Sequence, residues 1–326
     1  MVATASTGPD KGVYADLNDL VALEYRSRGF SLLPRQPVHS LLTGRHASRM
    51  RGRGLDFSEI RTYRPGDDVR SIDWRATARL ARPQVRIFNE ERDRRTFLVV
   101  DQRLSMFFGS RVAMKSVTAA ELAAAAAWRV IKAGDRVGAI VFDDSSSTSV
   151  EPQRNRRTVL RIFHEILVKN RALGVDRAIT PQPAMLNVAL KSVAGLARHD
   201  DTILVVSDFD GADAETRRMV IEMALHSDVL AALVHDPLQS ALPDAGQVTI
   251  TDGQAQLALD LGHAPTRDRV LDMSRQRLAD IRSWDRELGI PVLPISTADD
   301  PVLQVRALLG KAQAARRRTP RGNGGG

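Results

Sequence analysis

Two aspartates follow runs of apolar residues that are rich in β-forming side chains. Asp101 closes the run 96–100, and Asp208 follows the run 202–207. Neither run has a helical period, and each is typical of a strand buried on both faces of a parallel sheet. Because parallel strands end at a common sheet edge, we expect the two carboxylates to lie together on adjacent strands. Like charges held together require a proton, a cation or an arginine nearby.

Two interpretations of this edge remain open on the residues alone. A hard cation such as magnesium would suit the two carboxylates together with the hydroxyl of Ser105. The structural alternative is that Asp101 is only a capping residue at a strand-to-helix turn. The sequence lacks the motifs of two other kinds of site. It has no Gly-x-x-x-x-Gly-Lys loop of a P-loop ATPase, and its seven histidines show no metal-ligand spacing. A metal-dependent hydrolase is a weaker option, because no general base is identifiable.

The elements around these aspartates alternate between strands and helices. Further strands are predicted at 137–142, 229–234 and 291–295. Helices are predicted at 112–131, 156–173, 185–197, 212–226, 266–288 and 301–318, and a hairpin at 248–259. This alternation predicts an α/β fold with a doubly wound, mostly parallel sheet and helices on both faces.

The segment 45–94 differs in character, with thirteen arginines against eight acidic residues and no lysine. Strands at 55–63 and 83–91 bracket a short helix at 71–80, for which Ser71 is the expected cap. Together they predict a small antiparallel appendage. The pair Asp67 and Asp68 lies in a Pro-Gly turn, where pairing with nearby arginines is favoured over cation binding. Trp74 is interpreted as a packing anchor rather than a ligand platform.

The predicted organisation has four parts. A disordered start and an N-terminal helix occupy 1–44, the arginine-rich appendage 45–94, the α/β domain 95–310, and a basic, glycine-rich tail 311–326. The chain has no cysteine, no apolar signal core and no stretch near the roughly 20 apolar residues of a membrane span. We therefore expect a cytoplasmic protein. Its formal net charge of +8 favours an acidic partner or surface.

Several segments resemble a known family. Residues 101–105 resemble the Asp-x-Ser-x-Ser loop of von Willebrand factor A domains, whose adhesion site holds magnesium, and 205–208 resemble the strand carrying a later aspartate of that site. Upstream of this loop, a string of segments resembles, in content and order, a family of unknown function. Members of that family carry a degenerate von Willebrand A-like domain and are usually encoded beside MoxR-type AAA+ ATPases. These segments are Arg51-Gly-Arg-Gly-Leu-Asp-Phe57, Arg61-Thr-Tyr-Arg-Pro-Gly-Asp-Asp68, Ile72-Asp-Trp74, Thr77-Ala-Arg79 and Glu90-Glu91.

The chain departs from the metal-site pattern at two positions. Arg103 replaces the first serine of the loop, and the family's threonine falls near Ala184, with Thr180 as a possible substitute. Asp101, Ser105 and Asp208 therefore remain as a degenerate metal site. A guanidinium in this place would repel a cation and pair with either carboxylate. We predict that magnesium binds weakly or not at all and that Arg103 forms an ion pair at this edge.

The resemblance implies a non-enzymatic scaffold or adaptor. Such a protein would work with a MoxR-type AAA+ ATPase on an unknown client, in protein maturation, complex assembly or cofactor insertion. Arg103, Asp67, Asp68 and Trp74 are its candidate interaction residues. The alternative is a nucleic-acid-binding protein that uses 45–94, whose affinity would fall steeply with salt. It is less favoured because acids interrupt the basic residues and aromatic stacking partners are few.

Overall fold

The computed structural model of the 326-residue chain describes residues 12–27, 55–64, 67, 69–90, 94–174, 177–239, 247–251, 256–260 and 264–318. The chain divides into two compact units. The larger comprises Met1–His39 and Arg94–Gly326, and the smaller comprises Ser40–Asp93. The smaller unit is therefore an insertion within the sequence of the larger one. Of the predicted disordered start 1–12, only Gly12 is among the described residues. The predicted tail 311–326 begins too early, because α8 (Pro301–Arg318) continues through its first part; the residues after 318 lie outside the described ones.

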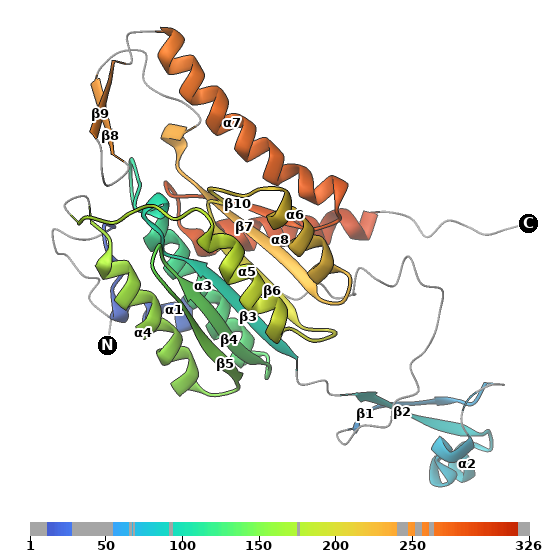
Figure 1. Cartoon of the computed structure of the whole chain (residues 1–326). Coiled ribbons are helices and arrows are strands. Elements are labelled where there is room, and N and C mark those ends of the chain that lie inside the picture. Colours follow the sequence, from blue (N-terminus) through green and yellow to red (C-terminus); the bar gives the residue numbers. More distant parts are fainter. Residues whose placement is uncertain are drawn as a thin grey trace, which may run out of the picture. The chain divides into compact units, whose positions relative to one another are not determined.

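A six-stranded sheet forms the centre of the larger unit, in the order β10-β7-β6-β3-β4-β5 (Figure 1). Its strands are β3 (Arg95–Asp101), β4 (Arg136–Phe142), β5 (Ser147–Gln153), β6 (Thr202–Ser207), β7 (Asp228–His235) and β10 (Val292–Ser296). All neighbours are parallel except β4 and β5. The predicted α/β class with a mostly parallel sheet is confirmed. The chain order reverses between β3 and β6, which is where doubly wound sheets bind ligands.

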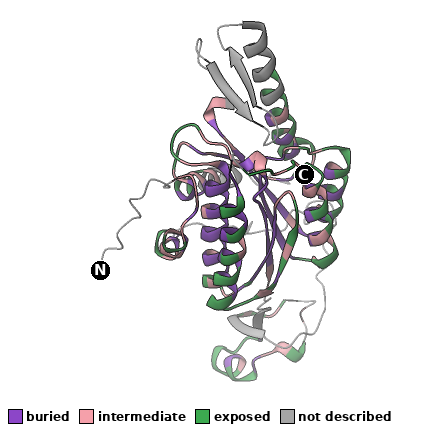
Figure 2. Cartoon of the chain, turned by 60° about the vertical axis from the view of Figure 1, so that its left-hand side comes forward, coloured by how far each residue is buried: buried purple, intermediate pink, exposed green. Residues whose placement is uncertain are grey.

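Helices cover both faces of this sheet. One face carries α1 (Leu17–Arg26), α3 (Lys115–Lys132), α4 (Arg156–Ala172) and α8 (Pro301–Arg318). The other carries α5 (Met185–Leu196), α6 (Ala214–Ala224) and α7 (Ala264–Glu287). Leu98 and Val100 of β3 contribute to the first core, whereas Phe97 and Val99 contribute to the second. Because both faces are covered, the buried strands have continuous apolar runs (Figure 2).

The long helix α3 lies at the centre of the first core. Its run of alanines is fully buried, and the small side chains let the helix approach the sheet on one side and α1, α4 and α8 on the others. Near the end of this run, the ring of Trp128 meets Phe163 edge-on at 5.7 Å between centroids. The indole Nε1 donates to the carbonyl of Leu20 at 3.0 Å. The N-terminal helix α1 is therefore part of the larger unit's core.

In the larger unit one strand was missed and the start of one long helix was wrong. The edge strand β5 was not predicted, because its sequence is polar and only Val150 in it is buried. Helix α3 begins at Lys115 rather than 112, because the preceding segment continues the loop that follows β3. The predicted hairpin is confirmed as β8 (Gln247–Thr251) paired antiparallel with β9 (Gln256–Asp260). Among the described residues, no helix is long and apolar enough to cross a membrane.

The smaller unit contains an antiparallel pair, β1 (Leu55–Thr62) and β2 (Gln84–Glu90), as predicted. Between them lie a 3₁₀ turn, η2 (Val69–Ser71), and helix α2 (Trp74–Leu80). The prediction that Ser71 caps this helix was wrong. Asp73 is the cap, because its carboxylate accepts from the backbone amides of Arg75 at 2.9 Å and Ala76 at 3.0 Å. Ser71 remains in the turn that precedes it.

The docking of α1 makes a prediction about stability. Leu20 is fully buried, whereas Leu17 on the same helix is 43% exposed. Leu20→Ala should lower the free energy of unfolding by about 2–5 kcal/mol, because it removes buried methyl groups and leaves a cavity. Leu17→Ala should change it by no more than about 0.5 kcal/mol. Urea unfolding measures both, and equal small losses would show that α1 is not part of the core.

Candidate functional site

The two predicted aspartates meet at the carboxyl edge of the sheet. Asp101 is the last residue of β3, and Asp208 directly follows β6. These strands are parallel neighbours, with Val100 opposite Val206. The predicted placement on adjacent strands and one edge is therefore confirmed. It coincides with the reversal of strand order, the position expected for a ligand site in this type of sheet.

Arg103 lies across this edge and pairs with Asp101. Its Nη2 is 2.7 Å from Asp101 Oδ2, and its Nε donates to both carboxylate oxygens at 3.0 and 3.2 Å. The same Nη2 is 3.8 Å from Asp208 Oδ1. Nη1 donates to the carbonyls of Pro183 at 3.0 Å and Asp210 at 3.1 Å. The predicted ion pair of Arg103 is present, and its guanidinium also joins three loops.

Arg103 remains charged although its side chain is only 1% exposed. Burial alone would lower the pKa of the guanidinium, but the charge and hydrogen bonds of Asp101, together with the charges of Asp208 and Asp210, raise this pKa above the ordinary arginine value. The face of Phe142 also lies 5.5 Å from the guanidinium carbon. A guanidinium that lies over an aromatic ring and forms parallel hydrogen bonds to one carboxylate is held in a fixed position.

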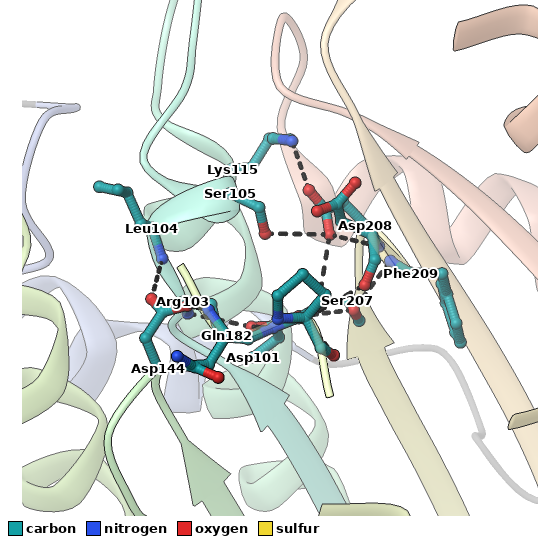
Figure 3. A network of polar contacts seen from close by, with 12 residues as sticks. Asp101, Arg103, Leu104, Ser105, Lys115, Asp144, Gln182, Ser207, Asp208 and Phe209 are labelled. Carbon is teal, nitrogen blue, oxygen red and sulfur yellow. Dashed lines mark hydrogen bonds and ion pairs between the residues drawn. The ribbon is translucent and has the colours of Figure 1, made fainter. Parts of the chain in front are cut away.

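A second cation, Lys115, was not predicted. It is the first residue of α3, its side chain is 2% exposed, and its Nζ lies 2.6 Å from Asp208 Oδ2 (Figure 3). Burial alone would raise the pKa of Asp208, but the charges of Lys115, Arg103 and Arg277 hold it below its ordinary value. The only signal in the sequence is a lysine at the start of a helix with a long run of alanines. The pair joins residues 93 positions apart, so local pattern cannot reveal it.

Neutral donors complete the environment of both carboxylates. The hydroxyl of Ser207 donates to Asp101 Oδ2 at 2.6 Å, and the backbone amide of Asp210 donates to Asp208 Oδ1 at 2.9 Å. Ser105, the predicted third ligand, is brought to the site, but its hydroxyl lies 3.4 Å from Asp208 Oδ1. At that distance the hydrogen bond is weak. Each carboxylate is thus held by a cation and at least one further donor.

These residues do not fit a magnesium ion. Magnesium requires near-octahedral oxygen ligands at about 2.0–2.1 Å, and the carboxylate oxygens instead face an ammonium and a guanidinium. Ala184, at the position of the family's threonine, begins α5 without a side-chain hydrogen bond. Within the described part of the chain, no three His, Cys, Asp or Glu side chains gather as a metal site would. The positive charge at this edge is supplied by the side chains of Arg103 and Lys115.

Other acids brace the loops at the same edge. Asp144, which follows β4, accepts from the backbone amides of Leu104 at 2.6 Å and Gln182 at 2.8 Å. It therefore ties the loop after β3 to the segment before α5, as Figure 3 shows. Asp236, which follows β7, accepts from the Ser110 amide at 2.9 Å. Neither Asp144 nor Asp236 was predicted from the sequence as a site residue.

The predicted interaction residues of the smaller unit have different environments. Asp67 accepts from the guanidinium of Arg61 at 2.8 and 2.9 Å and from the backbone amide of Arg64 at 2.7 Å. The favoured arginine pairing is confirmed for Asp67, whereas Asp68 lies outside the described residues. Trp74 is 71% exposed, so the packing-anchor interpretation was wrong. A seven-residue helix with Ala76 on its buried side leaves no apolar layer to cover this indole.

Comparison with known proteins defines the class to which this chain belongs. Residues 59–278 match the family described as "Protein of unknown function DUF58". This protein is therefore a member of the DUF58 family. It is 29% identical over 299 residues to uncharacterized protein Rv1480 of Mycobacterium tuberculosis and to uncharacterized protein Mb1516 of Mycobacterium bovis, covering 91% of this chain and 92% of each relative.

Two solved structures match this chain at low sequence identity. The conserved hypothetical protein BatB of Bacteroides thetaiotaomicron matches with a TM-score of 0.40 at 10% identity, over 68% of this chain and 99% of BatB. The VWA domain of SpRpn10 matches with a TM-score of 0.32 at 11% identity, over 67% of this chain and 94% of that domain.

The buried pair of Lys115 and Asp208 makes a prediction about coupling. Lys115→Met and Asp208→Asn should each lower the free energy of unfolding by about 3–5 kcal/mol, because each leaves a buried partner unpaired. The double variant should lose less than the sum, by about 1–3 kcal/mol. The exposed pair of Arg217 and Glu287, at 2.9 Å, is the control and should couple by less than about 1 kcal/mol. If the losses of unfolding free energy at Lys115 and Asp208 simply added up in the double variant, the two side chains would not interact, which would contradict the ion pair.

The same geometry makes a prediction about metal. Isothermal titration of magnesium into the wild-type chain should show weak binding or none. The variant Arg103→Ser with Lys115→Met removes both cations and restores a hydroxyl, so its affinity should exceed that of the wild type. Circular dichroism verifies that the variant is folded. Tight wild-type binding that the double substitution leaves unchanged would show that neither cation occupies the metal position.

Proposed function

We propose that this protein is a cytoplasmic, non-enzymatic scaffold that works with a MoxR-type AAA+ ATPase in the maturation or assembly of a client protein. The observation that carries the proposal is the closed carboxylate edge. Asp101 and Asp208 are paired with Arg103 and Lys115, which leaves their oxygens engaged by fixed donors. A general base or metal-activating carboxylate requires a free oxygen facing its substrate. The fixed edge suits a structural role better than a catalytic one.

The partner is proposed from the ordered segments between residues 51 and 91. Their succession resembles the family usually encoded beside MoxR-type ATPases, and the chain's membership of DUF58 supports this resemblance. The chain has no phosphate-binding Gly-x-x-x-x-Gly-Lys loop of its own. Mechanical work on a client would therefore have to come from the ATPase, with this chain supplying the contacts.

Co-purification and an ATPase assay test the proposal together. The tagged full-length chain, isolated from its native cells, should bring an AAA+ ATPase with it, whereas the same tag on an unrelated protein should not. The purified chain alone should hydrolyse no ATP. Robust hydrolysis by the chain alone would refute the scaffold role. A tight complex with DNA that weakens steeply with salt, without any ATPase, would favour the nucleic-acid alternative.

A further inference from the structure

The smaller unit exposes apolar side chains on a short stretch of chain. Trp74 is 71% exposed, and Val69 and Leu80 are 61% and 58% exposed. The other two tryptophans, Trp128 and Trp284, are buried in the larger unit. Tryptophan is highly buried on average, so an indole left in solvent is unusual. The three side chains lie within residues 69–80, and exposed apolar surface on a folded unit is a mark of interaction sites.

Arginines accompany these apolar groups. Arg75 and Arg79 are one turn apart on α2 and therefore lie on the same side of the helix. Arg82 follows just beyond the helix, and all three side chains are exposed. Asp73 is the single acidic residue in the sequence 69–85, and it is buried as the helix cap. The exposed side of this stretch is therefore positively charged.

This combination fits a carboxylate-bearing protein segment best. Tryptophan and arginine are the residues that most often dominate the energetics of protein interfaces. Guanidinium groups bind carboxylates through two parallel hydrogen bonds. A single-stranded nucleic acid would instead need several aromatic side chains for successive bases, and Trp74 is the sole aromatic residue in 69–85. At seven residues, α2 is also much shorter than typical interfacial membrane helices.

From these observations we infer that residues 69–82 form a docking surface for an acidic segment of a partner protein. The indole of Trp74 would cover an apolar side chain of that segment, and Arg75 and Arg79 would bind its flanking carboxylates. The inference rests on the proposed function in one respect, namely that the partner that docks here is the AAA+ ATPase. It goes beyond that function by naming the surface and the chemistry of the segment it accepts.

Trp74 provides its own test, because it is the exposed tryptophan among three. The probe is a synthetic peptide with Asp and Glu residues around a Leu-Phe pair, titrated into the full-length chain at about 0.15 M salt. Binding should protect tryptophan fluorescence from acrylamide quenching. A peptide with Asn and Gln in place of the acids should give no protection. Trp74→Phe should remove the quenchable signal and show that it arises at this residue.

Charge reversal tests the arginines. Arg75→Glu with Arg79→Glu should weaken peptide binding by about tenfold or more, because two charge-assisted contacts are replaced by repulsion. The matched control is Arg157→Glu with Arg161→Glu, an exposed pair at the same spacing on α4 beside the partly exposed Leu160. The control should bind the peptide like the wild type. Equal losses in both variants would show a general charge effect and overturn the inference.

The remaining outcomes separate other ligands. Stronger protection by a single-stranded oligonucleotide, or by vesicles that contain anionic lipid, would overturn the inference in favour of that ligand. Protection by none of the probes would also overturn it. The charge-reversed variant is then used in co-purification from native cells. An ATPase that still co-purifies with it would refute this surface while leaving the proposed function intact, whereas an ATPase absent even with the wild type would refute the function.

Discussion

The buried carboxylates at the carboxyl edge of the sheet keep their charge because a cationic side chain lies against each of them. Asp101 is paired with Arg103, and Asp208 with Lys115, in surroundings that expose almost none of the four side chains. Removing such charges from water is costly unless geometry and hydrogen bonding compensate. Here the guanidinium and ammonium bind at 2.7 and 2.6 Å, the Ser207 hydroxyl adds a donor to Asp101, and the Asp210 backbone amide adds one to Asp208. The edge is stable only as a complete network.

The loops at this edge depend on that network. Arg103 connects the end of β3 to the carbonyls of Pro183 and Asp210, and Lys115 connects the start of α3 to the end of β6. Gly211 follows with a positive φ of 75°, and a side chain there would collide with Pro183. Together with the brace at Asp144, these contacts fix the arrangement of loops over the sheet.

Features of the structure could be predicted from the sequence where residues close together in the chain determine them. Buried strands and their terminal acids could be predicted because apolar runs and the β–α alternation are local patterns, and Arg103 stood out against the metal-loop pattern. Lys115 was missed because its partner is far away in sequence. β5 was missed because an edge strand with one buried residue lacks an apolar run. Trp74 was misjudged because apolar character alone does not show whether a short helix has anything to pack against.

Arg103 and Lys115 occupy the place that a cation would take between Asp101 and Asp208. A crystal structure of the wild-type chain, grown and soaked in a high concentration of magnesium, tests this most directly. The guanidinium should remain bonded to Asp101 and the ammonium to Asp208, with no ion between the carboxylates. A magnesium ion coordinated by both aspartates, with the Arg103 side chain turned away from the edge, would contradict it.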